Sequence, residues 1–304
     1  MLFRSNDTAT TEIYTLHYIL SLHDALPICV VLAVISVLLI VRERGQWAFG
    51  TLPYPLLAFV ALATVSITWS YYPGATALGL VATYVTVVAG FALAVALSWA
   101  ELLKALGRTL RIILGLSIGF ELVVSLFVRA PVLPFWPSPG VDYDDLPTPI
   151  PKLLYWSRNE LFTADGKIQG IVGNSSLLGF VALLALIVFA IQFAGKTVGR
   201  ASGIASIVVA ALVIYLTRSA TITIALVVLA AVVVLVLLLR RFENRRGYIW
   251  AGVAVVVAGG IAVMIAIPDK LLALLGKSPD LTNRTEIWGH VIDLAQQRPA
   301  FGWG

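Results

Sequence analysis

The chain has 304 residues, of which 60% are hydrophobic and 12% charged, and its mean hydropathy is +0.95. A soluble domain carries about 25% charged residues, so this composition excludes an ordinary soluble core and indicates a membrane protein. The formal net charge of +5 comes from short basic clusters between apolar runs, which are typical of membrane topology signals and not of nucleic-acid binding.

The supply of metal-binding side chains is small. Cys29 is the single cysteine, which excludes an intrachain disulfide and a multi-cysteine metal site. The histidines are His17, His23 and His290, too few for a structural zinc site. We therefore expect no metal and no cofactor.

The apolar runs predict an all-α fold, a polytopic transmembrane helical bundle of about eight spans. A bilayer core of roughly 30 Å needs about 20 helical residues. The runs cover residues 28–41, 50–68, 76–97, 110–128, 171–194, 202–216, 220–239 and 249–267. Residues 204–239 would be roughly 54 Å long as one helix, so we expect two spans with a turn at residues 217–219. The turn places Arg218 at a membrane face, away from the costly bilayer centre.

Basic residues orient the spans, because cytoplasmic loops are enriched in lysine and arginine. The loops after the first, third, fifth and seventh spans hold Arg42, Arg44, Lys104, Arg108, Arg111, Lys196, Arg200, Arg240, Arg241, Arg245 and Arg246. The short loops on the opposite side hold Arg218 alone. We therefore expect the loop at 129–170, the Arg218 turn and the tail at 268–304 to face outward from the cytoplasmic (inner) membrane, with 28–267 as the transmembrane domain.

The two ends of the sequence predict an incomplete reading frame. Residues 1–27 contain NDTATTEIYTL and SLHDALPI, which resemble translated sequencing-adaptor DNA, although a genuine extracytoplasmic tail is the alternative. The sequence stops at Gly304, in what reads as a loop after a helix. We expect an artefactual start and a C-terminal truncation.

Aromatic and acidic side chains gather in the outward loop at 129–170. The aromatic rings offer flat faces to sugar rings, or anchor the loop at the bilayer interface. They are Phe135, Trp136, Tyr143, Tyr155 and Trp156. The acidic side chains are Asp142, Asp144 and Asp145, which form either a cation site or a solvated turn.

Two polar side chains accompany the spans. Glu121 lies in the middle of the fourth apolar run, where a carboxylate is expensive. It is either a functional group, a hydrogen-bonded packing residue, or a residue facing a wet cavity. Asn174 opens the fifth run together with Ser175 and Ser176, where it caps the helix and could help bind an anion.

The tail predicts one more helix. Asn283 and Glu286 form a capping-box-like start, and Pro299 marks the end. Arg284 and Trp288 share one face of this helix, with Val291 and Ala295, while His290 reads as an exposed residue. Arginine grips phosphate through two parallel hydrogen bonds, so Arg284 and Arg218 on one outer face are candidate phosphate ligands. By physics alone, lipid anchoring or a structural ion pair also explains each arginine separately.

Several fragments, in order along the chain, resemble the family of O-antigen ligases and O-antigen polymerases. They are SITWSYYPGATAL at 66–78, GIVGNSSLLGF at 170–180, LTRSATITIAL at 216–226 and NRTEIWGHVIDLAQQRPAFGWG at 283–304. The resemblance implies a GT-C-like helical membrane glycosyltransferase. It also implies that Arg218 and Arg284 contact a polyprenyl-diphosphate-linked saccharide donor at the outer membrane face. Glu121, Asn174 and Trp288, from their own positions in the sequence, are candidate supporting residues.

The resemblance also sets limits. The family's proposed catalytic histidine follows the Gly-x-Gly ending, beyond Gly304, so we expect the chain as given to be inactive. The acceptor would be a glycan or a lipid. The alternative is a transporter or flippase of lipid-linked saccharides, which would use intramembrane charges such as Glu121. The chain shows no obvious half-to-half repeat to support that alternative.

Overall fold

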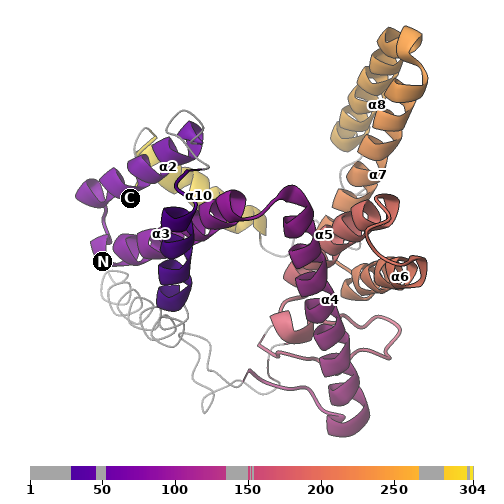
Figure 1. Ribbon diagram of the computed structural model, residues 1–304, viewed down its shortest axis with the longest axis horizontal. Helices are drawn as coiled ribbons and strands as arrows, with labels where there is room; N and C mark the ends of the chain where they lie inside the picture. The colour runs from indigo at the N-terminus through magenta and orange to yellow at the C-terminus, as the bar shows by residue number, and fades with distance from the viewer. Residues whose placement is uncertain are drawn as a thin grey trace. The chain divides into compact units, whose positions relative to one another are not determined.

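The computed structural model describes residues 29–45, 53–134, 150, 152, 154–266, 284–299 and 302–303. Within these residues the fold is all-α, with no strand among the named elements, as the sequence predicts (Figure 1). The predicted segment 1–27 lies outside the described residues, as do the loop acids and Phe135, Trp136 and Tyr143. The chain divides into two compact units, 1–106 with 134–151 and 294–304, and 107–133 with 152–293.

The first unit contains three apolar helices and the first residues of a fourth. They are the helix Cys29–Arg42, α2 (Tyr54–Val65) continued by the 3-10 turn η2 (Ser66–Trp69), and α3 (Pro73–Ala96). Pro73 occupies the first turn of α3, where its missing N–H leaves no intrahelical bond unmade. The Tyr84 hydroxyl of α3 lies 2.6 Å from Thr64 Oγ1 and joins the two neighbouring helices.

The second unit is built on three packed helices. They are α4 (Trp99–Val123, continued to Val128 by the π-helix η3), α5 (Ser175–Ala194) and α6 (Arg200–Thr217). In Figure 1, α5 and α6 lie side by side, and small residues let them approach closely. Ala182 and Ala185 of α5 and Ala210 of α6 are fully buried. Leu114 of α4 is buried as well, so the three helices share one core.

Arg111 of α4 adds a polar link between these helices. Its Nε donates to Ser206 Oγ on α6 at 2.8 Å, and its Nη2 donates to Gln192 Oε1 on α5 at 2.7 Å. The guanidinium carbon also lies 4.8 Å from the centre of the Phe189 ring. Arg111 therefore bonds to both neighbours of α4.

The basic residues near the start of α4 correct one prediction. Lys104, Arg108 and Arg111 were expected in a loop before a span at 110–128, but α4 begins at Trp99 and contains all three. Ser98 starts the helix early, because its N–H and Oγ both donate to Glu101 Oε2, at 2.9 and 2.6 Å. The first turns of α4 are thus an amphipathic continuation of the span.

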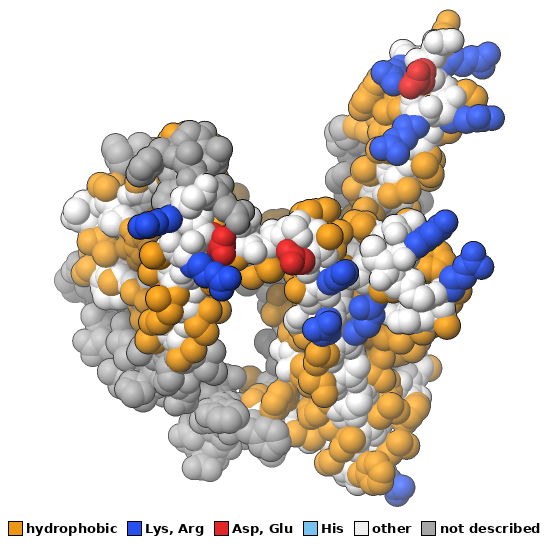
Figure 2. Space-filling model, viewed as in Figure 1, with side chains coloured by type: hydrophobic (Ala, Val, Ile, Leu, Met, Phe, Trp, Pro, Cys, Tyr) orange, Lys and Arg blue, Asp and Glu red, His pale blue; other side chains and the backbone are white. Residues whose placement is uncertain are grey.

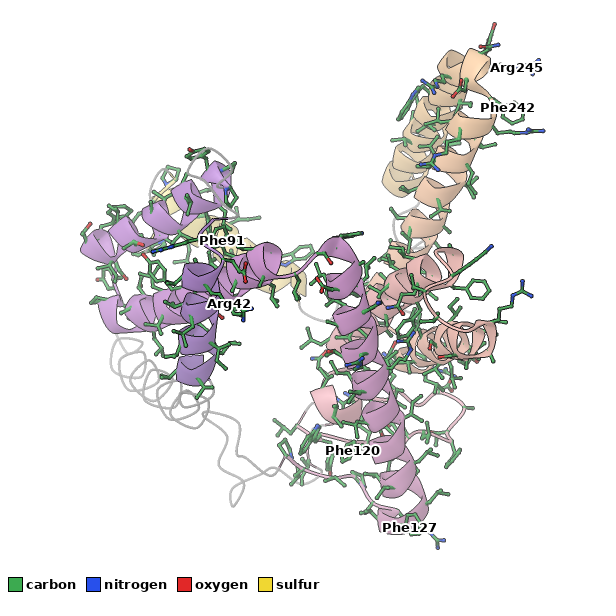
Figure 3. All side chains as sticks on the ribbon, in the orientation of Figure 1. Arg42, Phe91, Phe120, Phe127, Phe242 and Arg245 are labelled. Carbon is green, nitrogen blue, oxygen red and sulfur yellow. The ribbon has the colours of Figure 1, made fainter. Side chains whose placement is uncertain are left out.

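The last two long helices form a hairpin. α7 (Ala220–Arg241) and α8 (Arg246–Ala266) are joined by the turn η5 (Glu243–Arg245), where Figure 3 labels Phe242 and Arg245. Lysine and arginine side chains gather at this turn in Figure 2, and hydrophobic side chains cover much of both helices. Val255 and Val256 of α8 are 72% and 75% exposed, which is costly in water and favourable in lipid.

Five of the described helices are long and apolar enough to cross a membrane. They are Pro73–Ala96, Trp99–Val128, Ser175–Ala194, Arg200–Thr217 and Ala220–Arg241. The helices Cys29–Arg42 and Tyr54–Trp69 are shorter and also apolar. The multi-pass membrane fold is confirmed, while the total of about eight spans and the domain boundaries stay predictions.

Candidate functional site

The turn between α6 and α7 forms at the predicted residues. α6 ends at Thr217, Arg218 takes a left-handed conformation with φ 45°, and Ser219 leads into Ala220 at the start of α7. The Arg218 N–H donates to the carbonyl of Tyr215 at 3.3 Å and closes the end of α6. Arg129 and Lys196 have a similar φ at other helix ends, so the conformation marks a helix terminus and does not by itself indicate a function.

The side chain of Arg218 is held by two partners in the loop between α4 and α5. Nη1 forms an ion pair with Asp165 Oδ1 at 3.2 Å, and Nη2 donates to the carbonyl of Ala164. The guanidinium carbon lies 5.9 Å from the centre of the Tyr215 ring. The side chain is one third exposed, so part of the cation stays open to a ligand. Because the Asp165 side chain is fully exposed, solvent screens this ion pair strongly and a bound anion can displace it.

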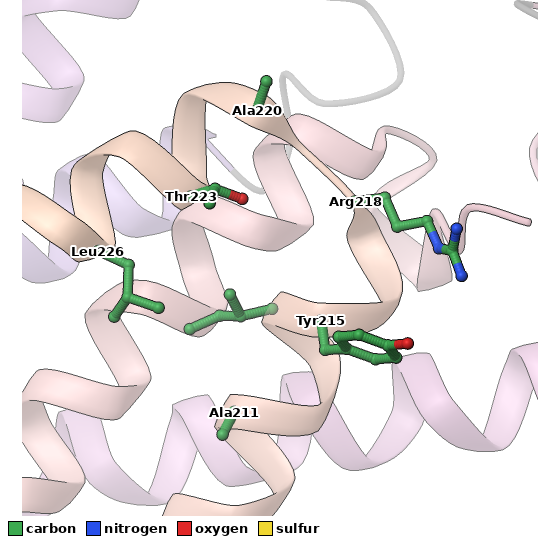
Figure 4. Close-up of a pocket in the computed structure, with 7 residues that line it drawn as sticks. Ala211, Tyr215, Arg218, Ala220, Thr223 and Leu226 are labelled. Atoms are coloured by element: carbon green, nitrogen blue, oxygen red, sulfur yellow. The ribbon is translucent and has the colours of Figure 1, made fainter. Parts of the chain in front are cut away.

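An apolar cavity adjoins this arginine. It has a volume of about 580 Å³ and lies in the angle between α6 and α7 (Figure 4). Its lining residues are Ala211, Ile214, Tyr215, Arg218, Ala220, Thr223 and Leu226. Arg218 and Tyr215 extend to the same side of the turn in Figure 4, so a charged group and an apolar space lie next to each other. That combination suits an amphiphile with an anionic head.

The loop segment at 154–170 is folded around Glu160. Lys152 Nζ donates to Glu160 Oε1 at 2.8 Å, and the Lys167 N–H donates to Oε2 at 3.3 Å. Partial burial acts to raise the pKa of Glu160, but these two hydrogen bonds and the charges of Lys152 and Arg158 outweigh it and lower the pKa below the ordinary 4.5. The Gly166 N–H donates to the carbonyl of Thr163 and completes the turn.

This lowered pKa predicts a pH dependence. A carboxyl whose pKa is lower in the folded state contributes stability above pH 4.5, and this contribution is lost as the pH falls through the folded-state pKa. We expect the melting temperature of the wild type to fall more steeply below pH 4.5 than that of Glu160→Gln. Thermal denaturation in detergent between pH 7 and pH 3 measures the difference. Parallel curves for the two proteins would contradict the contribution of Glu160.

Glu121 fixes the end of this loop onto α4. The carboxylate is 1% exposed, and Oε1 accepts the N–H groups of Gln169 and Gly170, both at 2.8 Å. Oε2 accepts the Ser157 hydroxyl at 2.7 Å. Of the three interpretations left open by the sequence, this geometry favours the hydrogen-bonded packing residue, because three donors use both oxygens. Its predicted role as a supporting site residue is not tested further.

Asn174 and Trp156 also have structural contacts. Asn174 Oδ1 accepts the N–H groups of Ser176 and Leu177, at 2.9 and 3.1 Å, which confirms the predicted cap of α5. Trp156 donates to the carbonyl of Ile171 at 3.2 Å, and its ring lies 5.3 Å from that of Phe120, labelled on α4 in Figure 3. Trp156 therefore packs the loop against the helix.

The described residues contain no group of three or more histidine, cysteine, aspartate or glutamate side chains that could hold a metal ion. The residues expected at 142–145 lie outside the described part of the chain.

Comparison with known families finds one match. Residues 204–304 match the family described as O-antigen ligase. This segment is an O-antigen ligase domain. No curated protein and no solved structure matches the chain. The chain is therefore a multi-pass membrane protein that carries an O-antigen ligase domain at residues 204–304, in agreement with the resemblance of its sequence fragments.

The O-antigen ligase domain contains three of the predicted site residues. Arg218 lies at the α6–α7 turn, and Arg284 is the first residue of α10 (Arg284–Gln297), which confirms the predicted helix. Trp288 and His290 on α10 are exposed. Asn283 and the side chain of Arg284 lie outside what the structure describes, and none of the described contacts joins α10 to Arg218.

Two residues at the candidate site were missed from the sequence. Tyr215 lies three residues before Arg218 on α6, a helical spacing that could have indicated the contact. Asp165 is far from Arg218 along the chain, so no local sequence pattern could have predicted their ion pair. The cavity also has no sequence signal, because it depends on the angle at which α7 leaves the turn.

Proposed function

We propose that the protein belongs to a glycosyl transfer system that moves a glycan from a polyprenyl-diphosphate donor to an acceptor at the outer face of the cytoplasmic membrane. The observation that carries the proposal is the O-antigen ligase domain at residues 204–304, with Arg218 beside an apolar cavity inside it. The donor has two parts that match this site. Its anionic diphosphate matches the cation of Arg218, and its apolar polyprenyl chain matches the cavity.

The reaction needs a cation where charge develops. The acceptor hydroxyl attacks the anomeric carbon, the bond from that carbon to the diphosphate oxygen breaks, and the hydroxyl proton passes to a general base. The released diphosphate gains negative charge as this bond breaks. A guanidinium at a partly dry membrane interface stabilises that charge more strongly than a guanidinium in bulk water does. The contacts that hold Arg218 to Asp165 and Ala164 support this role, and Arg284 is the second proposed ligand.

We expect Arg218→Ala to reduce transfer from a polyprenyl-diphosphate donor by about tenfold to a hundredfold. The range corresponds to one charge-assisted contact of about 1.5–3 kcal/mol. Arg218→Lys should recover only part of the rate, because an ammonium cannot reproduce the two-pronged contact. Transfer is measured as radiolabelled glycan moved to the acceptor in membranes.

Arg240→Ala is the matched control, because Arg240 lies in the last turn of α7, at the helix end away from the Arg218 turn. Wild-type transfer by the Arg218→Ala protein, at equal abundance in the membrane, would refute the diphosphate role. Movement of lipid-linked saccharide across the bilayer without glycan transfer would instead support the flippase alternative.

A further inference from the structure

The segment around Trp303 is fixed against the end of α10. The Gly302 N–H donates to the carbonyl of Arg298 at 3.1 Å, and Gly302 has φ 65°, a conformation that favours glycine. Trp303 Nε1 donates to the carbonyl of Leu294 at 3.0 Å. The guanidinium carbon of Arg298 lies 4.6 Å from the centre of the indole, so a cation is stacked on the ring.

Trp303 in turn pairs with the turn between η2 and α3. The Tyr71 N–H donates to the carbonyl of Trp303 at 3.0 Å, and the two rings meet edge to face, with centres 5.7 Å apart and planes at 73°. Tyr72 meets Tyr71 in the same way, at 5.7 Å and 65°. Two segments far apart in the sequence thus build one group of rings within the first unit.

The turn that carries the tyrosines is itself fixed. Ser70 Oγ lies 2.7 Å from Thr76 Oγ1 and accepts the Tyr72 N–H at 3.1 Å. Pro73 follows directly with a restricted φ. The rings are therefore held in place before any ligand arrives, which lowers the entropy lost on binding.

We propose that Tyr71, Tyr72 and Trp303, together called the aromatic platform, form a saccharide-binding subsite, with Arg298 as a further hydrogen-bond donor. The edge-to-face arrangement leaves ring faces uncovered, and the tyrosines are 63% and 52% exposed. The apolar C–H face of a hexose packs against such a ring, while its hydroxyl groups reach the tyrosine O–H and the arginine N–H groups. Glycan as the ligand rests on the proposed function.

A membrane-interface anchor is the competing assignment for exposed tyrosine and tryptophan. The observations favour the saccharide, because an anchor needs no fixed array of rings. Here a backbone hydrogen bond joins Tyr71 to Trp303, and the stacked guanidinium of Arg298 adds a charge beside the rings. A sugar has an apolar C–H face, which suits the aromatic rings, and hydroxyl groups, which suit the guanidinium of Arg298.

Saturation-transfer NMR on the full chain in nanodiscs tests the subsite. The probes are a soluble neutral hexose trisaccharide and a trisaccharide that contains a uronic acid, neither of which carries a lipid or a diphosphate. We expect saturation of at least one probe by the wild type. The double variant Tyr71→Ala/Tyr72→Ala should weaken binding by at least about tenfold. Tyr248→Ala removes a tyrosine that is 82% exposed on α8 and should bind as the wild type does.

The single variant Tyr71→Phe keeps the ring and loses only the hydroxyl, so it should retain most of the binding and guards against a fold defect in the double variant. The subsite would be overturned by saturation of neither trisaccharide by the wild type, or by equal saturation by the wild type and the double variant. A double variant that changes only the quenching of tryptophan fluorescence by brominated lipid would assign the rings to the membrane interface and also overturn it.

Farnesyl diphosphate, which carries no sugar, separates this inference from the proposed function. Its binding should fall with Arg218→Ala and stay unchanged in Tyr71→Ala/Tyr72→Ala. Absence of farnesyl diphosphate binding with intact trisaccharide binding would count against the diphosphate site alone. The opposite result would count against the aromatic platform alone.

Discussion

Glu121→Ala is expected to lower the free energy of unfolding by about 3–5 kcal/mol. The substitution leaves the Ser157 hydroxyl and the N–H groups of Gln169 and Gly170 buried without their acceptor. Each buried unpaired group costs about 1–3 kcal/mol, and part of this is recovered when water enters. Because all three donors belong to the loop, its attachment to α4 should fail first. Trypsin should then cleave after Arg158 and Lys167, and the melting temperature in detergent should fall.

Glu121→Gln separates a packing role from a role of the charge. The amide oxygen can still accept both backbone N–H groups, and the amide nitrogen can donate to Ser157 Oγ once that hydroxyl turns. We expect the free energy of unfolding to fall by under about 1 kcal/mol and transfer to stay near normal. Glu243→Ala removes a carboxylate exposed to solvent and serves as the control. A stable Glu121→Gln protein without transfer activity would instead make the charge of Glu121 functional.

Arg111→Ala is expected to cost about 3 kcal/mol of stability. Two hydrogen bonds from a charged donor disappear, together with the contact on the Phe189 ring. Gln192 loses a donor between packed helices, and α4 loses its polar link to α5 and α6. The melting temperature in detergent and the rate of unfolding in SDS both report this change. Arg240→Ala, in the last turn of α7, should leave both values unchanged.

Gly107→Ala provides an independent test of the same network. A Cβ at residue 107 would lie 2.2 Å from Gln192 Nε2, so the Gln192 amide must turn away and leave Arg111. Because both substitutions break one contact, the double variant Gly107→Ala/Arg111→Ala should cost less than the sum of the single variants. Strict additivity would show that Arg111 and Gln192 are not energetically coupled.

The sequence alone predicted the helices and the turns between them well, because membrane spans are set by local quantities. The length of an apolar run determines whether a helix can cross the bilayer, and the cost of burying Arg218 divides 204–239 into two helices. The cap at Asn174 and the helix from Arg284 follow from hydrogen bonds between near neighbours in the chain. The predicted start of α4 was wrong, because the basic residues in its amphipathic first turns resemble those of a cytoplasmic loop.

Only the tertiary structure decided what the polar side chains do. The carboxylate of Glu121 holds the loop because residues 157 and 169–170 fold back onto it. No hydrophobic periodicity or motif spacing in the sequence predicts these contacts. The partners of Arg218 and the ring contact between Tyr71 and Trp303 likewise join residues far apart in the chain. Such contacts depend on how the helices pack. The sequence therefore determines the membrane fold and the match of residues 204–304 to O-antigen ligases, and the packing determines the sites.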